Sequence, residues 1–168
     1  MRLGDGVEWS LHCCSVLATL PPHEAIPAAR LAEFHGVAPA YLAKQLQALS
    51  TAGIVTTRRG RRGGYHLARP PADITLLDVV LAVEGPGPAF RCSEIRQRGP
   101  SAVPAERYLR PCGIARRMGR AEQAWRNELQ RTTLADLTDE LATSVDPEQL
   151  ERAFVWLVDV LADRERKD

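Results

Sequence analysis

Two cysteines in a long, irregular stretch are the residues of this sequence that most directly suggest chemistry. Cys92 and Cys112 stand in a Pro- and Gly-rich, basic segment, with nineteen residues between them. Such a pair fits a disulfide, a redox-active pair of thiols or half of a metal site. The N-terminal residues lack the basic-then-apolar layout of a signal peptide, and no apolar run approaches the ~20 residues that span a bilayer. We therefore expect a cytoplasmic protein, where metal binding or thiol redox chemistry is favoured over a structural disulfide.

A four-ligand metal site needs two further donors, and helix geometry sorts the candidates. The other thiols and imidazoles of the chain are Cys13, Cys14, His12, His23, His35 and His66. Helical spacing predicts a helix over residues 3–20. The apolar stripe of this helix is expected to contain Leu3, Val7, Leu11, Cys14 and Ala18. Because Cys14 belongs to the stripe, we expect it to be a buried core thiol.

Glu8 and His12 are the residues of this helix that suit the second half of a site. They are four residues apart, so their side chains stand one above the other on a face that the apolar stripe does not use. Cys13 lies ~140° from Glu8 around the helix, so the two cannot share a small site. A Glu–His pair at this spacing is by itself more often solvated. A cysteine-bearing loop that needs two more ligands makes the pair a candidate.

The small net charge of +1 conceals an uneven distribution of charged residues. Residues 1–70 carry eight Lys and Arg against four Asp and Glu, whereas residues 71–168 carry fourteen against seventeen. Four of the N-terminal arginines fall within residues 58–62. A basic face on one part of a protein suggests an anionic partner, with nucleic acid the first candidate.

The order of the predicted elements around this basic run is that of a winged helix-turn-helix. Two prolines end the first helix at 21–22, and two further helices are expected over 27–36 and 39–53. Pro27 and Pro39 suit first turns, and Gly36 and Gly53 suit positions just past the helix ends. Strands are expected at 54–57 and 65–67, joined by the basic tip. Paired helices followed by a hairpin predict a DNA-binding domain with a wing.

Candidate DNA contacts follow from these predicted elements. Near the N-terminal end of the recognition helix we expect Ala38, Ala40, Tyr41, Lys44 and Gln45. Gln45 suits adenine, and Lys44 suits guanine or a phosphate, whereas Tyr41 fits either core packing or a phosphate contact. In the wing, the candidates for phosphate or minor-groove contacts are Arg58, Arg59, Arg61 and Arg62. Gly63 and Gly64 would let the hairpin turn tightly and approach the DNA backbone.

The rest of the chain is expected to be helical apart from the cysteine loop. A helix is predicted over 74–85, with Thr75 and Asp78 as an approximate capping box. A long helix is predicted from Gly113 to Arg131, and Thr133–Asp136 and Asp146–Pro147 mark the starts of further helices. One apolar stripe of the long helix contains Ile114, Met118, Ala121, Trp125 and Leu129. We expect this stripe to be a homodimer contact rather than a core face.

The expected fold is therefore mainly α, with a small β-hairpin wing and a long dimerisation helix. Three parts are expected: a winged helix-turn-helix domain over 1–85, a metal-binding loop over 86–112, and the dimerisation and C-terminal helices over 113–168. An enzyme is not expected, because the sequence shows no Ser/His/Asp constellation, no phosphate-cradling Gly loop followed by Lys, and no paired-carboxylate motif.

Several segments resemble the winged-helix iron–sulfur regulators that include IscR and NsrR, over about residues 3–131. The family resemblance is clearest in the wing-to-helix segment GGYHLARPPADITLLDVVLAVEG, and the segments that resemble the RsrR type of this family are GVEWSLHCC, YLAKQ, CSEIRQRGP and Pro111–Ala115. Better-known members place three cysteines close together in this loop, whereas this sequence has none between Cys92 and Cys112. It is similar instead to the RsrR type of redox regulator. That resemblance implies a [2Fe–2S] cluster bound by Glu8, His12, Cys92 and Cys112.

The resemblance also implies a biological role and an assembly. It implies a homodimeric transcriptional repressor of operator DNA, with each cluster bridging the two protomers. Trp9, next to Glu8, is then a candidate switch residue, with core packing as the alternative. Two other possibilities stay open for the site: Zn²⁺ at the same four residues, and thiol sensing without a cluster.

Overall fold

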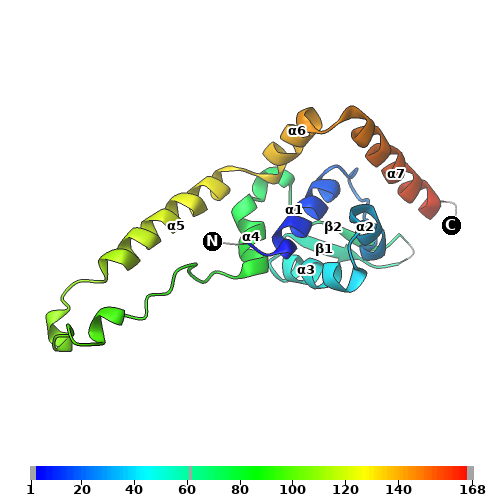
Figure 1. The fold of residues 1–168 in the computed structure, drawn as a ribbon. Coiled ribbons are helices and arrows are strands. Elements are labelled where there is room, and N and C mark those ends of the chain that lie inside the picture. Colours follow the sequence, from blue (N-terminus) through cyan, green and yellow to red (C-terminus); the bar gives the residue numbers. More distant parts are fainter. Residues whose placement is uncertain (1–2, 61, 166–168) are drawn as a thin grey trace.

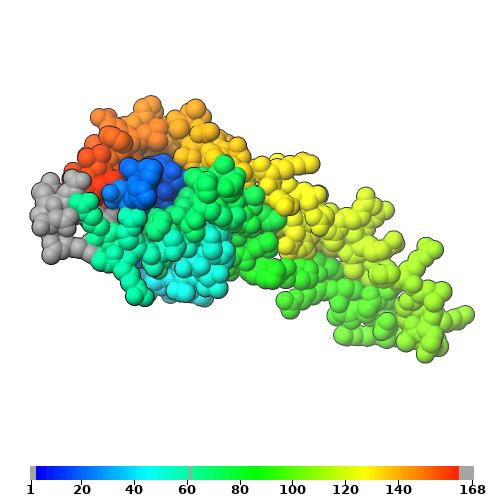
Figure 2. Space-filling view, turned by 180° about the vertical axis from the view of Figure 1, so that it is seen from behind, coloured from blue at the N-terminus to red at the C-terminus, as the bar shows by residue number. Residues whose placement is uncertain are grey.

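Seven α-helices and one two-stranded antiparallel hairpin make up the described part of the chain, residues 3–60 and 62–165 of the computed structural model. Helices α1 to α4, the hairpin, α6 and α7 gather into a head, from which an arm projects (Figure 1). The arm consists of α5 and the loop that precedes it. The same projection is visible from behind in Figure 2, so the arm stands clear of the head in both views.

The first three helices are α1 (Asp5–Ala18), α2 (Ala28–His35) and α3 (Pro39–Thr51). Gly36 follows α2 with φ +62°, a left-handed conformation that glycine adopts without strain, and Pro39 opens α3. The predicted helix-turn-helix is therefore confirmed. The stripe predicted for α1 is wrong at Leu3, which precedes the helix and is 37% exposed. Val7 and Cys14 are buried as expected.

The wing is formed by β1 (Val55–Arg58) and β2 (Gly64–Leu67), with Val55 opposite Leu67 and Arg58 opposite Gly64. The segment before α2 joins this hairpin, because Ile26 and Tyr65 exchange backbone hydrogen bonds of 2.9 and 2.8 Å. A Cβ atom at position 64 would lie 2.4 Å from the carbonyl carbon of Ile26. Gly64 is therefore required by a close approach within the protein itself.

Helix α4 (Leu76–Glu84) begins with the predicted capping box. The Thr75 hydroxyl accepts a hydrogen bond from the Asp78 N–H at 3.1 Å, and the Asp78 carboxylate accepts one from the Thr75 N–H at 3.0 Å. Arg69 adds an ion pair to Asp78 at 3.1 Å. These bonds satisfy backbone donors that the first turn of a helix leaves free, and they fix where α4 starts.

The arm begins beyond α4. Its loop contains two short 3₁₀ turns, Ile95–Gln97 and Ala105–Arg107, and leads into α5 (Gly113–Arg131). Arg126 donates to the carbonyls of Pro86 and Gly87 at 3.3 and 3.1 Å, and Glu122 accepts from the Ala89 N–H at 3.0 Å. The outgoing loop is thereby tied to the returning helix at the base of the arm. Two further bonds, Leu76 N–H to Thr132 O and Leu134 N–H to Ile74 O, join the end of α5 to the head.

The last two helices, α6 (Leu134–Ser144) and α7 (Pro147–Glu165), cover the head. Both predicted caps are confirmed: Thr133 and Asp136 form a capping box, and Asp146 accepts from the N–H groups of Glu148 and Gln149. Leu134 and Val160 enter the core of the head. No helix in the described part of the chain is long and apolar enough to cross a membrane.

Candidate functional site

The structure brings the two loop cysteines together in the arm. Cys92 lies in the loop, and Cys112 is the N-cap residue of α5. Their sulfur atoms and one carboxylate oxygen of Glu94 all lie within 4.8 Å of one another. Cys92 is exposed and Cys112 is buried. A loop of nineteen intervening residues therefore closes so that two thiols face each other.

A set of polar contacts holds this loop closed. The Glu94 carboxylate pairs with the Arg96 guanidinium at 2.6 Å, and that guanidinium lies 5.2 Å from the centroid of the Tyr108 ring. The Tyr108 hydroxyl donates to the Arg96 carbonyl at 2.7 Å and accepts from the Val103 N–H at 3.2 Å. Arg96 also donates to the Arg110 carbonyl at 3.3 Å. The two halves of the loop are thus connected through Arg96 and Tyr108.

The electrostatics of the two thiols differ because of where each stands. Hydrogen bonds from the Ala115 N–H and the Ile114 N–H, at the start of α5, lower the pKa of Cys112, and the Arg96 charge adds to this. The Glu94 N–H acts in the same direction on Cys92, but partial loss of solvation and the neighbouring Cys112 and Glu94 groups outweigh it and raise the pKa of Cys92. Cys112 is therefore the thiol that ionises first.

Glu94 and Arg96 were not among the predicted site residues. The Arg96 guanidinium lowers the pKa of the Glu94 carboxyl group, so this group is a carboxylate near neutral pH. Glu94 also has a left-handed backbone, with φ +48°, which is uncommon for a residue with a side chain. Its position two residues after Cys92 was the signal available in the sequence.

The other two cysteines are isolated from this centre. Cys13 and Cys14 are fully buried in α1, and burial raises the pKa of each to about 12. In native, reduced and metal-free protein, we expect iodoacetamide to modify Cys92 at least ~100-fold faster than Cys13 or Cys14. Peptide mass spectrometry would measure this, and unfolding in urea should make all four thiols reactive. Equal rates at Cys13 and Cys92 in the native protein would contradict the packing of α1.

Glu8 and His12 lie on α1, in the head, and both side chains are exposed. The arm carries Cys92 and Cys112 away from the body that contains α1 (Figure 1). Within one chain, the structure therefore brings together two of the four predicted ligands and leaves the other two on a separate surface.

The His12 ring lies 5.7 Å from the ring of His35, the last residue of α2. Burial lowers the pKa of His35 to about 4.

Trp9 connects the face of α1 next to Glu8 to the recognition helix. Its side chain is half-buried against the core, and its ring centroid lies 6.2 Å from that of Tyr41. Tyr41 is 65% exposed, so core packing does not account for its position. A side chain adjacent to a predicted ligand therefore contacts a predicted DNA-reading residue.

On α3, the side chains predicted to face DNA divide into two groups. Ala38, Ala40, Tyr41 and Lys44 are exposed. Gln45 is half-buried and its amide faces α1, because a Cβ atom at Gly6 would lie 2.8 Å from the Gln45 amide carbon. Leu42 and Leu46 are buried as expected. Base reading by Gln45 stays a prediction, while Tyr41 and Lys44 project from the surface of the helix.

In the wing, Arg58, Arg59 and Arg62 are exposed, and Arg61 lies outside the described residues. The Arg58 guanidinium donates to the His23 carbonyl, which ties the wing to the turn before α2. Gly63 closes the tip with a hydrogen bond of 2.8 Å to the Gly60 carbonyl. The basic tip of the hairpin therefore lies on the surface, in the position expected for a wing.

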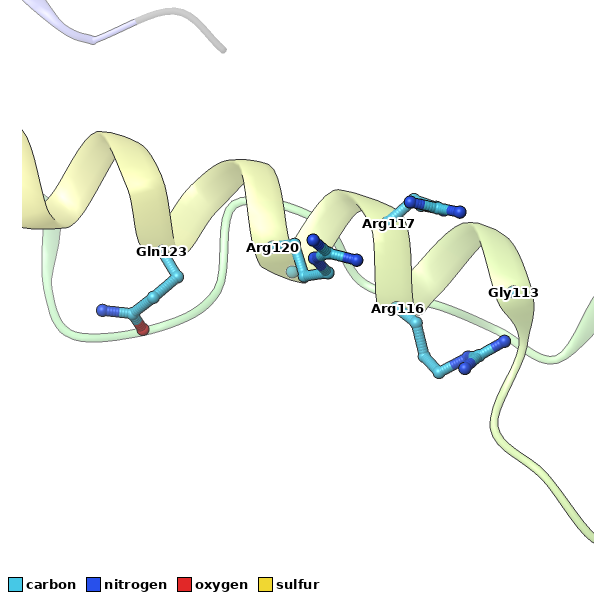
Figure 3. Close-up of a pocket in the computed structure, with 6 residues that line it drawn as sticks. Gly113, Arg116, Arg117, Arg120 and Gln123 are labelled. Carbon is cyan, nitrogen blue, oxygen red and sulfur yellow. The ribbon is translucent and has the colours of Figure 1, made fainter.

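Helix α5 has two different faces along the arm. Ile114 and Met118 of the predicted apolar stripe are 65% and 44% exposed, whereas Trp125 and Leu129 are half-buried. At ~100° per residue, the opposite side carries Arg116, Arg120 and Gln123. Figure 3 shows these side chains around a shallow hollow on the first turns of the helix, with Arg117 beside them. Apolar side chains are thus exposed on one face of a helix whose other face is charged.

Comparison with known proteins identifies the family. The sequence profile of the Rrf2 family, described as an iron-dependent transcriptional regulator, matches residues 3–140. The chain belongs to the Rrf2 family. Members of this family are transcriptional regulators and not enzymes, so the chain is a DNA-binding transcriptional regulator. The match ends within α6, so α7 lies beyond it.

Individual relatives agree with this assignment. The chain is 33% identical over 138 residues to Rv1287 of Mycobacterium tuberculosis (strain H37Rv), named as an HTH-type transcriptional regulator, covering 82% of this chain and 81% of the relative. Its fold is similar to that of T. potens IscR, with TM-score 0.65 and 20% identity over 89% of this chain and 96% of the other. It is also similar to CymR (YrzC), the global cysteine regulator of B. subtilis, with TM-score 0.61 and 25% identity over 83% and 98%. The predicted winged-helix fold is confirmed, and the likeness to the RsrR type stays a prediction.

Proposed function

We propose that this Rrf2 protein is a dimeric repressor that senses redox state through a [2Fe–2S] cluster bound between two protomers. Cys92 and Cys112 of one chain would bind one iron, and Glu8 and His12 of the other chain would bind the second. The observation that carries the proposal is the pairing of the two thiols in the arm, whereas Glu8 and His12 stand on α1 in the head of the same chain. A second protomer can supply that face.

The residues fit such a group chemically. Thiolates are the usual ligands of iron–sulfur clusters, and the contacting sulfur atoms of Cys92 and Cys112 suit one iron. An imidazole in place of a thiolate reduces the negative charge and raises the reduction potential. Glu8 offers a harder oxygen ligand, which favours a centre that rearranges easily. When bound, the cluster supplies a one-electron redox couple.

The chain also offers a route from this centre to DNA. Glu8 and His12 stand on α1, and the intervening Trp9 contacts Tyr41 on the recognition helix. A change at the Glu8–His12 face that repositions Trp9 would therefore act directly on α3. Through the arm, the same change would alter how two heads of a dimer are held relative to each other. Both effects change DNA binding without a contact between the cluster and DNA.

The cluster is tested by purification without oxygen. We expect the wild-type protein to be coloured and to contain iron and acid-labile sulfide, with a visible spectrum that changes on reduction. His12→Ala should lose the cluster and, with it, redox-dependent DNA binding. A colourless wild-type protein without iron would contradict the cluster and leave the DNA-binding assignment intact. Metal analysis would then distinguish zinc in the same residues from a metal-free thiol sensor.

The wing is tested through the salt dependence of DNA binding. Arg59→Ala should weaken binding to every duplex several-fold and reduce the slope of log affinity against log salt concentration by about 1. The measurement would use duplexes selected from a random pool and an unrelated duplex of equal length. Arg152→Ala on α7 removes an equal charge from an exposed position. It should leave the salt-dependence slope unchanged for the selected duplexes and for the unrelated duplex. An unchanged slope for Arg59→Ala would show that this residue does not contact phosphates.

A further inference from the structure

Glu94 forms, with the two loop cysteines, a group of ligand atoms that belongs to one chain. Its carboxylate oxygen, Cys92 Sγ and Cys112 Sγ lie within 4.8 Å of one another, without any contribution from Glu8 or His12. The Glu94 carboxylate is divided between two partners. One oxygen faces the Cys92 sulfur at 3.6 Å, and the other binds the Arg96 guanidinium at 2.6 Å. Arg96 therefore orients the carboxylate so that it presents an oxygen to the thiols.

We propose that Cys92, Glu94 and Cys112 of a single chain bind one thiophilic divalent cation of the Zn²⁺ class when the protein holds no cluster. Two sulfur ligands and one carboxylate oxygen are donor types that Zn²⁺ accepts, and water completes a tetrahedron. Softer thiolates disfavour Mg²⁺ and Ca²⁺, which prefer oxygen ligands throughout. The site shares its cysteines with the proposed cluster but does not depend on a second protomer.

Charge balance supports this site. Two thiolates and a carboxylate carry three negative charges, and a divalent cation together with the Arg96 guanidinium carries three positive charges. Arg96 lies against the carboxylate, with its guanidinium 2.6 Å from the carboxylate oxygen that faces away from the thiols. The metal, its three ligands and Arg96 would together be neutral, and a second residue that orients a ligand oxygen is typical of metal sites.

The local backbone places Glu94 in this position. Glu94 has a left-handed conformation, with φ +48° and ψ 48°, immediately before the 3₁₀ turn of Ile95–Gln97. This turn brings Arg96 back over the carboxylate, and Tyr108 holds it there from the other half of the loop. Cys112 enters from the start of α5, where backbone N–H groups favour its thiolate. Glu94 and Cys112 are thus positioned by two different local structures, the 3₁₀ turn and the start of α5.

Cobalt(II) is the probe that tests the site, because it accepts the ligands of Zn²⁺ and absorbs visible light through thiolate coordination. Full-length, reduced, iron-free protein should bind one Co²⁺ per chain, with a sulfur-to-metal absorption band that Zn²⁺ abolishes. Glu94→Gln should weaken Co²⁺ binding by ~10-fold or more, and Cys92→Ser combined with Cys112→Ser should remove the sulfur band. Glu106→Gln, an exposed carboxylate of the same loop, should bind as the wild type does. Circular dichroism would establish that each variant is folded.

The Glu8→Gln/His12→Ala double variant separates this site from the proposed cluster. It should bind Co²⁺ as tightly as the wild type, because neither residue belongs to the single-chain site. Loss of Co²⁺ binding in this variant, one Co²⁺ per two chains, or unchanged affinity in Glu94→Gln would each overturn the proposal. Cluster reconstitution in the same variants tests the cluster independently: assembly in Glu8→Gln/His12→Ala would refute the proposed cluster ligands and leave the cobalt result standing.

Discussion

Chains that carry Glu8→Gln and His12→Ala, mixed with chains that carry Cys92→Ser and Cys112→Ser, should assemble a cluster that neither variant assembles alone. The first variant keeps the arm cysteines, and the second keeps the α1 pair. A mixed dimer therefore contains one complete set of four ligands, provided that the arm of one protomer reaches the head of the other. Random pairing yields mixed dimers in about half the population, so iron content should reach about a quarter of the wild-type value.

Differently tagged, co-expressed chains allow the mixed dimer itself to be purified. It should then contain one cluster per dimer, seen as iron, acid-labile sulfide and the visible spectrum. The two parent homodimers, treated in the same way, should be colourless. A mixed dimer without a cluster would contradict bridging between protomers. A cluster in the homodimer that lacks Glu8 and His12 would show that the arm binds it without the partner's head.

The elements that the sequence predicted most accurately are those with a local chemical signal at their ends. The side chains of Thr75, Asp78 and Asp146 mark helix starts because they accept hydrogen bonds from backbone N–H groups, and Pro147 suits the first helical position. Gly36 marks a helix end through its left-handed backbone. These signals involve residues only two to four positions apart, so neighbouring sequence contains all the information. The prediction at Leu3 was wrong because it relied on apolar spacing alone. Spacing does not show where a helix begins, and α1 has no side-chain cap at its start.

The interior of the cysteine loop was not predictable in this way. Its closure depends on Arg96 contacting Glu94 two residues before it and Tyr108 twelve residues after it. No periodic pattern links these positions, because the loop lacks regular secondary structure apart from its two short turns. Likewise, the pattern of α7 indicated an amphipathic helix but not the surface that it covers. That surface includes Phe34, whose ring lies 4.5 Å from Trp156.

The arrangement at α1 shows what helical facing does and does not establish. The positions of Glu8 and His12 around the helix axis separate them from the core stripe, and both side chains are exposed in the structure. Helical facing could not place them relative to Cys92 and Cys112, since that distance depends on the direction of the arm. In the proposed cluster, the exposed pair on the head and the thiol pair on the arm would form one site only in an assembly, so the proposal depends on the dimer contact.

Ile114→Asp combined with Met118→Asp should convert the protein to a monomer and abolish both the cluster and tight operator binding. Both side chains are exposed in the single chain, at 65% and 44%, on the apolar face of α5. Two carboxylates in a contact between copies of this helix would lose solvation without a partner, which costs several kcal/mol. This corresponds to a dimer dissociation constant raised at least ~100-fold. Light scattering or sedimentation would measure the assembly. The substitution at position 114 changes only the side chain, so the backbone N–H that faces Cys112 is retained.

Gln123→Asp combined with Asn127→Asp provides the matched control. These two residues are exposed on the opposite face of α5, and the substitutions add the same charge to the same helix. This variant should remain a dimer and retain its cluster and its DNA affinity. If both double variants became monomeric, charge on the arm rather than its apolar face would be responsible. If both remained dimeric, α5 would not be the dimer contact, and the Glu8–His12 face would have to meet the arm cysteines by another route.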